Sequence, residues 1–177
     1  PDIVLLVNGI PLVVIECKKS SVDVVEGIHQ NVRNWQPDYI PNLFKFAQLV
    51  VAMNPNDVRY GTCGTTAEFY AKWQEEEVKW LDETVRRHIR DKNPTVQDRN
   101  IVSLFSRERL LNLIRYYILY DNGIKKIARY QQYFGVENIT VSYTHLLAHE
   151  TPEPLVCRLP LEKKKQQYTS LLTPQCH

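Results

Sequence analysis

The chain lacks several features that would assign it to a broad class at once. Its apolar runs fall short of the roughly 18 consecutive residues that a membrane-spanning helix needs, and no signal-peptide pattern opens it. The four cysteines form no C-x-x-C pair, and Cys17 lies within an expected strand. Reduced thiols in a cytoplasmic protein are therefore the simplest interpretation.

A strong excess of one charge is also absent. The formal net charge is +2, so contacts with nucleic acid would have to come from local clusters of basic residues. The 177 residues, 44% hydrophobic and 24% charged, are typical of a globular chain with one domain and part of another. Because no initiator methionine is present and the chain starts within a motif, we expect a fragment of a longer protein.

The most informative stretch is the N-terminal one, PDIVLLVNGIPLVVIECKK. Asn8-Gly9 between two β-branched runs predicts a hairpin, because both residues tolerate positive φ. The second strand, Pro11 to Cys17, is apolar on both faces and should lie inside a sheet. It ends in Glu16-Cys17-Lys18, although charged side chains are seldom buried unless they are paired or bind a metal.

The position of Asp2 relative to Glu16 depends on the hairpin register. Side chains alternate along a strand, so Glu16 and Lys18 share one face. A regular two-residue loop would pair Asp2 with Ile15 and turn Asp2 away from Glu16. A three-residue loop or a bulge would bring Asp2 onto the face of Glu16. A site that uses both carboxylates therefore requires an irregularity in the hairpin.

Two carboxylates and a lysine at a strand end suit Mg²⁺-dependent phosphodiester hydrolysis. Mg²⁺ prefers hard oxygen ligands, which Asp2, Glu16 and the Cys17 carbonyl would supply. Lys18 would orient or help to deprotonate the attacking water and offset transition-state charge. The alternative is a hairpin whose polar end merely meets solvent.

The same stretch resembles the nuclease core of the PD-(D/E)xK superfamily. It is similar in particular to the restriction (R) subunit of type I restriction–modification enzymes, in which a PDIVLxVNGxPLVVIExK string occurs. The resemblance implies an α/β fold with a mixed sheet flanked by helices. It also implies a Mg²⁺-dependent endonuclease that cleaves double-stranded DNA and, in the intact subunit, is coupled to ATP-driven translocation. Methyltransferase (M) and specificity (S) subunits of the same system are the expected partners.

A helix is predicted after the active-site strand. Asp23 is a good N-cap, Pro37 ends the helix, and the apolar stripe comprises Val25, Ile28, Val32 and Trp35. By resemblance Gln30 matches a family glutamine that acts near the scissile phosphate, and we assign it to the catalytic set. The family tyrosine four residues later is replaced by Asn34. Without the resemblance, Gln30 would be read as a solvated residue, since it lies off the stripe.

The middle of the chain predicts one more strand and mostly helices. The run from Phe46 to Met53 is another interior strand, and Arg59 to Thr65 is either a turn or a family segment that closes the sheet near DNA. We expect a mostly helical segment over 67–90, a loop over 91–97 and a second helix from about Ser106. The core side of that helix is expected to comprise Leu110, Leu111, Ile114, Tyr117 and Ile118.

From Asp121 the sequence resembles the entry of the R subunit into its first RecA-like motor domain. Gln132 matches by position a family glutamine that reads the adenine of ATP. Lys125, Lys126 and Arg129 are read as a solvated basic face. The phosphate-binding loop G-x-x-x-x-G-K-[ST] is absent, so ATP would be a cofactor of the full-length protein only.

These observations predict four regions: a partial endonuclease core (1–80), a helical linker (81–120), a truncated start of motor domain 1 (121–138) and a tail (139–177). The tail has no clear period, is interrupted by prolines and contains VSYTHL, which resembles a reading frame of a transposon adapter. We therefore expect it to be non-native or frameshifted.

The leading hypothesis is a fragment of a type I site-specific deoxyribonuclease that is inactive by itself. A second is a catalytically inactive nuclease-fold module that binds DNA or partner subunits. A third is a chain that forms no stable protein because its sheet edges are exposed.

Overall fold

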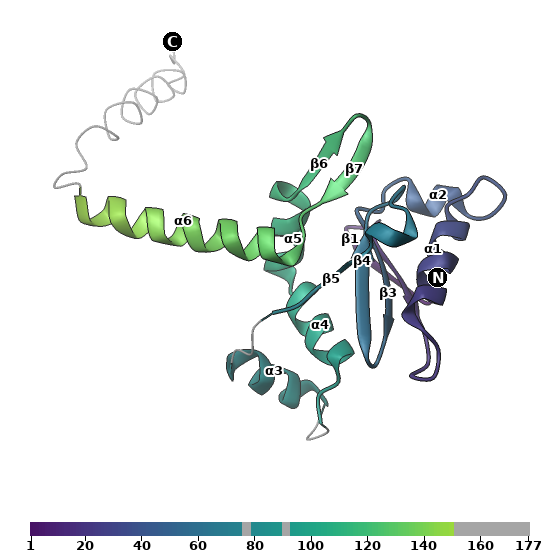
Figure 1. The fold of residues 1–177 in the computed structure, drawn as a ribbon, viewed down its shortest axis with the longest axis horizontal. Coiled ribbons are helices and arrows are strands. Elements are labelled where there is room, and N and C mark those ends of the chain that lie inside the picture. The colour runs from purple at the N-terminus through teal and green to yellow at the C-terminus, as the bar shows by residue number, and fades with distance from the viewer. Residues whose placement is uncertain (76–78, 90–92, 151–177) are drawn as a thin grey trace, which may run out of the picture. The chain divides into compact units, whose positions relative to one another are not determined.

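The computed structural model describes residues 1–75, 79–89 and 93–150 (Figure 1). Residues Pro1–Gly135 form one compact unit, and a second begins at Val136. Within the described ranges no helix has both the length and the apolar character needed to cross a membrane. The predicted tail lies largely outside the described residues, but helix α6 (Tyr130–Glu150) runs on past position 139.

A five-stranded mixed sheet forms the centre of the first unit. Its strands are β1 (Ile3–Val7), β2 (Ile10–Cys17), β3 (Leu49–Asn54), β4 (Asp57–Gly61) and β5 (Ala71–Lys72), arranged in that order. Only β2 and β3 run parallel, and the other neighbouring pairs are antiparallel. The expected α/β fold, a mixed sheet flanked by helices, is thereby confirmed.

Strands β2 and β3 are covered on both faces, as their near-continuous apolar runs predict. Between them the chain forms α1 (Val24–Asn34) and the short α2 (Pro41–Phe44). Helix α1 covers one face, over a core that includes Val14 and Val50. The opposite face is covered by later helices, over a core that includes Val13 and Leu49 (Figure 1).

The buried face of α1 differs from the predicted apolar stripe. Asp23 caps the helix as expected, accepting a hydrogen bond from the Val25 amide at 2.9 Å. Val25 itself is 40% exposed, so its predicted place in the stripe is wrong. The residues that are buried share one helix face and include three small or polar ones: Val24, Gly27, Ile28, Asn31 and Asn34. Packing against the sheet thus selects a different face from hydrophobicity alone.

The prediction of a mostly helical segment over residues 67–90 is confirmed for 79–89 but wrong around β5. That stretch contains a 3-10 turn (η1, Ala67–Phe69), strand β5 and a shorter helix, α3 (Lys79–Ile89). Pairing of Ala71 and Lys72 with β4 extends the sheet and interrupts the helix. Sheet extension therefore overrides the helical pattern in this segment.

Two further helices follow. Helix α4 (Val96–Leu104) starts in the predicted loop and is held by a capping box between Thr95 and Asp98. Helix α5 (Arg107–Tyr116) confirms the predicted second helix, with Leu110 buried as expected. Its core also takes Leu113, whereas Leu111 is 40% exposed.

A polar cluster joins these helices to the sheet. Trp73 Nε1 donates to Ser103 Oγ at 2.9 Å, and Ser103 Oγ donates to Glu75. Arg109 binds Glu75 through both Nη atoms, at 2.6 and 3.1 Å, and lies over the ring of Tyr133. Glu75 is thus a paired structural residue.

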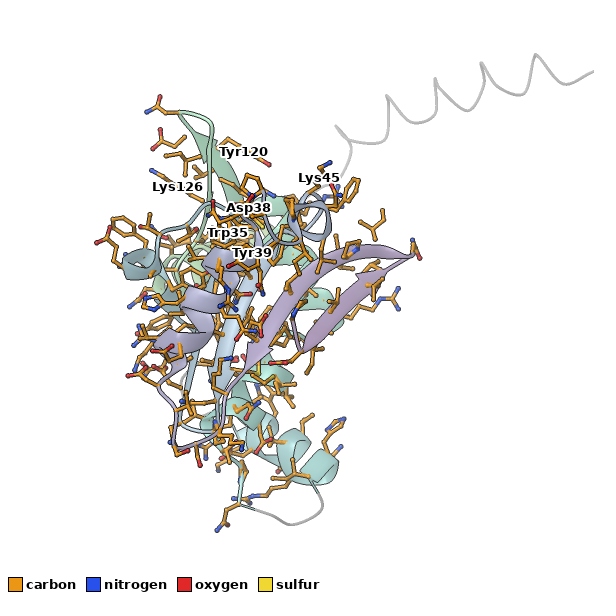
Figure 2. All side chains as sticks on the ribbon, turned by 90° about the vertical axis from the view of Figure 1, so that its right-hand side faces the viewer. Trp35, Asp38, Tyr39, Lys45, Tyr120 and Lys126 are labelled. Carbon is orange, nitrogen blue, oxygen red and sulfur yellow. The ribbon has the colours of Figure 1, made fainter. Side chains whose placement is uncertain are left out.

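A small hairpin follows α5, made of β6 (Ile118–Asp121) and β7 (Ile124–Ile127). Its turn is Asn122-Gly123, both at positive φ, and Figure 2 labels Tyr120 and Lys126 on it. Lys125 Nζ donates to Gln48 Oε1 at 3.0 Å, which ties the hairpin to the chain just before β3. Residues 121–135, expected at the start of the motor domain, therefore belong to the same compact unit as the sheet. The four-region division itself stays a prediction about the longer protein.

The closest approach of α1 to the sheet gives a stability prediction. A Cβ on Gly27 would lie 3.1 Å from the Ala52 Cβ and 3.5 Å from the Lys18 side chain. Gly27→Val should lower the free energy of unfolding by about 1–3 kcal/mol through overpacking. Gly135→Val, a helical position with nothing near its Cβ, is the matched control. Urea denaturation measures both, and equal effects would contradict the close packing.

Candidate active site

The hairpin contains the irregularity that a two-carboxylate site requires. The turn Asn8-Gly9 is a two-residue loop, but the register shifts between Leu5 and Leu6. Leu5 pairs with Val13 and Leu6 pairs with Pro11, so Leu12 is an extra, bulged residue. The Leu12 carbonyl accepts a hydrogen bond from the Gln48 amide at 2.8 Å, which anchors the bulge.

Beyond the bulge the register brings Asp2 opposite Glu16. Ile3 pairs with Ile15, and the Asp2 amide donates to the Ile15 carbonyl at 3.1 Å. The Asp2 carboxylate accepts a hydrogen bond from the Cys17 amide at 2.6 Å. Asp2 is therefore held at the carboxyl end of β2, next to Glu16.

The thiol of Cys17 reports the negative charge gathered at this strand end. Burial raises its pKa, and the Asp2 and Glu16 carboxylates raise it further, while Lys18 opposes them. Both carboxylates thus act electrostatically on the same point. The Cys17 carbonyl, predicted as a ligand, lies on the backbone between Glu16 and Lys18, and its ligand role stays a prediction.

Glu16 is a buried carboxylate with one unpartnered oxygen. Its side chain has no solvent-exposed area. Oε1 accepts a hydrogen bond from Asn34 Nδ2 at 2.9 Å. Among the residues that the structure describes, Oε2 has no hydrogen-bond partner. Since buried charged oxygens are costly unless they are paired, Oε2 suits a bound cation.

The donor set fits Mg²⁺. Mg²⁺ is usually held by one or two carboxylates together with several waters, and Asp2 and Glu16 provide two carboxylates at one strand end. Within the described parts of the chain, no group of three or more His, Cys, Asp or Glu side chains is placed to hold a metal.

Lys18 and Gln30 are in contact. Lys18 lies on the same face of the strand as Glu16, and its Nζ donates a hydrogen bond to Gln30 Oε1. Gln30 borders the buried face of α1 that contains Gly27 and Asn34, because that face is rotated away from the predicted stripe. The structure thus brings together four predicted site residues at one strand end: Asp2, Glu16, Lys18 and Gln30.

An open groove of about 350 Å³ adjoins Lys18 and Gln30. Its other lining residues come from the start and outer side of α1: Val22, Glu26, His29 and Arg33. The guanidinium of Arg33 lies 5.4 Å from the centre of the Tyr39 ring, just beyond the end of the helix (Figure 2). The lysine of the site can therefore be reached from solvent along the outer side of α1.

Comparison with known proteins gives the family of the chain. Residues 1–69 match the profile of the type I restriction enzyme R protein N terminus. The chain belongs to the type I restriction R protein family. It is 31% identical over 144 residues to the HindI endonuclease subunit of Haemophilus influenzae. It is 30% identical over 129 residues to the EcoprrI endonuclease subunit of Escherichia coli, and 32% identical over 152 residues to a putative MjaVIIP endonuclease subunit of Methanocaldococcus jannaschii.

These relatives are longer than the chain. The HindI match covers 77% of this chain and 13% of the relative, and the MjaVIIP match gives the same shares. The EcoprrI match covers 69% of this chain and 37% of the relative. The chain thus spans a small part of the R proteins that it resembles.

Two positions matter for comparison with the R protein pattern. Asn34, where the family tyrosine was expected, contacts Glu16 directly; the sequence marked Asn34 as a departure but did not predict this contact. Gln132 lies exposed in the first turn of α6, where its Oε1 accepts from the Arg129 amide at 2.9 Å. Its predicted role toward adenine stays a prediction.

The Glu16–Asn34 contact gives a prediction that separates two neutral substitutions. Both Glu16→Gln and Glu16→Leu remove the buried charge, but only glutamine leaves an acceptor for Asn34. Glu16→Leu should be less stable than Glu16→Gln by about 1–3 kcal/mol, since an unpaired buried donor carries that penalty. The measurement is urea denaturation in the presence of a chelator. Equal stabilities would show that the Asn34 amide does not depend on Glu16.

Proposed function

We propose that the chain forms the DNA-cleaving centre of a type I restriction R subunit and that the intact subunit hydrolyses double-stranded DNA with Mg²⁺. The observation that carries the proposal is the buried, unpartnered Glu16 Oε2 beside Asp2 and Lys18 at one strand end. A carboxylate oxygen kept without a partner in an apolar sheet is expected where a cation is to be held. This pattern supports a PD-(D/E)xK type of nuclease.

Glu16 Oε2, the Asp2 carboxylate and the Cys17 carbonyl would hold Mg²⁺. When bound, the ion would supply Lewis-acid polarisation of the scissile phosphate. Lys18 Nζ would orient the attacking water and offset the negative charge that develops on phosphorus. Gln30, whose Oε1 accepts from Lys18 Nζ, would hold the ammonium group in place and use its amide hydrogens toward a phosphate oxygen.

The groove along α1 gives DNA a path to Lys18. Lys18, His29 and Arg33 line it together with one carboxylate, Glu26. The basic residues would contact phosphates and position the backbone without reading sequence. The net charge of the chain is only +2, so DNA binding would depend on this local cluster of basic residues in the groove.

The longer protein would supply the other activities. The relatives are named as endonuclease subunits of type I restriction enzymes, and translocation by such a subunit would use ATP. The chain has no phosphate-binding loop, so ATP hydrolysis would reside outside these residues. Methyltransferase and specificity subunits would be partners of the assembled enzyme.

Cleavage and ATP hydrolysis should therefore separate on mutation. In a full-length subunit that contains these residues, Glu16→Ala or Lys18→Ala should abolish DNA cleavage at saturating Mg²⁺ and leave ATP hydrolysis intact. Lys19→Ala, at an exposed neighbouring lysine, is the control and should cleave normally. Plasmid linearisation and phosphate release are the two measurements. Normal cleavage by Glu16→Ala would favour a module that only binds DNA or partner subunits.

Gln30→Ala tests the support that α1 gives to Lys18. It should reduce cleavage by about 10- to 100-fold, the range seen when outer partners of a metal site are removed, with no change in the unfolding midpoint. Gln36→Ala, at an exposed amide that bonds only to the Val32 carbonyl, should retain wild-type cleavage. If Gln30→Ala also cleaved at the wild-type rate, Gln30 would be a surface residue without a catalytic part.

A further inference from the structure

Two amides on α1 contact the two charged residues at the carboxyl end of β2, Glu16 and Lys18, in reverse order. Gln30 accepts from Lys18, and Asn34 donates to Glu16. Residues four apart on a helix lie about 5–6 Å from each other, and residues two apart on a strand about 6.6 Å. A helix that runs antiparallel to the strand can therefore contact both positions at once.

Asn34 and Glu16 meet in the protein interior. Glu16 has no exposed area and Asn34 is 7% exposed, so the 2.9 Å bond from Nδ2 to Oε1 is shielded from water. Asn34 thus fixes Oε1, and within the described part of the chain the second oxygen is left without a hydrogen-bond partner.

We propose that Asn34 is a positioning residue that holds the Glu16 carboxylate so that Oε2 is presented to the divalent cation. The proposal rests on the proposed function, since it concerns the same metal site. Carboxylates that bind metals are themselves hydrogen-bonded, and this fixes their orientation. Asn34 performs that task from the position of the family tyrosine, by an amide donor in place of a ring. The metal affinity of the site is then set from α1 as well as from β2.

Direct binding of Mn²⁺, measured without DNA from the electron paramagnetic resonance signal of free Mn²⁺, tests the proposal in a full-length subunit. Asn34→Leu keeps the side-chain volume and removes the donor, so it should raise the Mn²⁺ Kd by about 10- to 100-fold. Asn34→Gln retains an amide and should recover most of the affinity.

Asn31→Leu is the matched control. Asn31 lies one turn earlier on the same helix, is also buried and donates to the Val51 carbonyl instead of to Glu16. It should lower the unfolding midpoint and leave the Mn²⁺ Kd unchanged. A purely structural role of Asn34 would produce the same result for Asn34→Leu.

The outcomes distinguish failure of the positioning role from failure of the proposed function. A wild-type Kd in folded Asn34→Leu overturns the positioning role and leaves the metal site standing. A wild-type protein that neither binds Mn²⁺ nor cleaves DNA overturns the proposed function and the positioning role with it. If Asn34→Leu does not fold, Asn34→Ala gives the same decision, because it also removes the donor; a raised Kd supports the role and an unchanged one overturns it.

Discussion

A carboxylate placed inside a β-sheet is the constraint on which the rest of this structure depends. Glu16 occupies a strand that is apolar on both faces, and a charge there is tolerated only if its oxygens have partners. Helix α1 supplies one partner through Asn34. The remaining oxygen stays open, which is unfavourable for folding but suited to binding a cation. The unpartnered Glu16 Oε2 thus lowers the stability of the fold and at the same time provides an oxygen that a cation can bind.

The opposite side of the sheet compensates through dense packing. There the apolar residues of β2, β3 and β4 meet α4, α5 and the first turn of α6. The cluster around Arg109 and Glu75 ties the chain after β5 to α5. Packing on that face fixes the position of β2 and β3. The carboxyl end of β2 can therefore remain accessible on the other face, next to α1 and the groove.

Much of the fold was predictable because its signals are local. Asn8-Gly9 identified the first hairpin, and the apolar run before Asn54 identified β3. The same turn signal recurs at Asn122-Gly123 and would have identified β6 and β7. In this segment the local residues are a better guide to the fold than its resemblance to a motor entry.

The site was predictable in composition but not in its contacts. Charge at the end of an interior strand pointed to Asp2, Glu16 and Lys18, and family resemblance added Gln30. Hydrophobic periodicity predicted that Val25 lies on the buried face of α1, because such a pattern assigns only apolar side chains to the interior. Asn31 and Asn34 are inside because they bond to the sheet and to Glu16. Such contacts depend on tertiary partners that a pattern within one helix does not contain.

The bulge at Leu12 limits how the length of this hairpin can change. One extra residue between the turn and Glu16 sets which face of the sheet the N-terminal carboxylate occupies. Insertion or loss of a single residue in this arm would leave a hairpin with nearly the same apolar content, yet would exchange the inward and outward sides of β1 relative to β2. Asp2 stays on the same face of the sheet only if residues are inserted or lost two at a time. The arm of this hairpin can therefore vary in residue identity far more freely than in residue number.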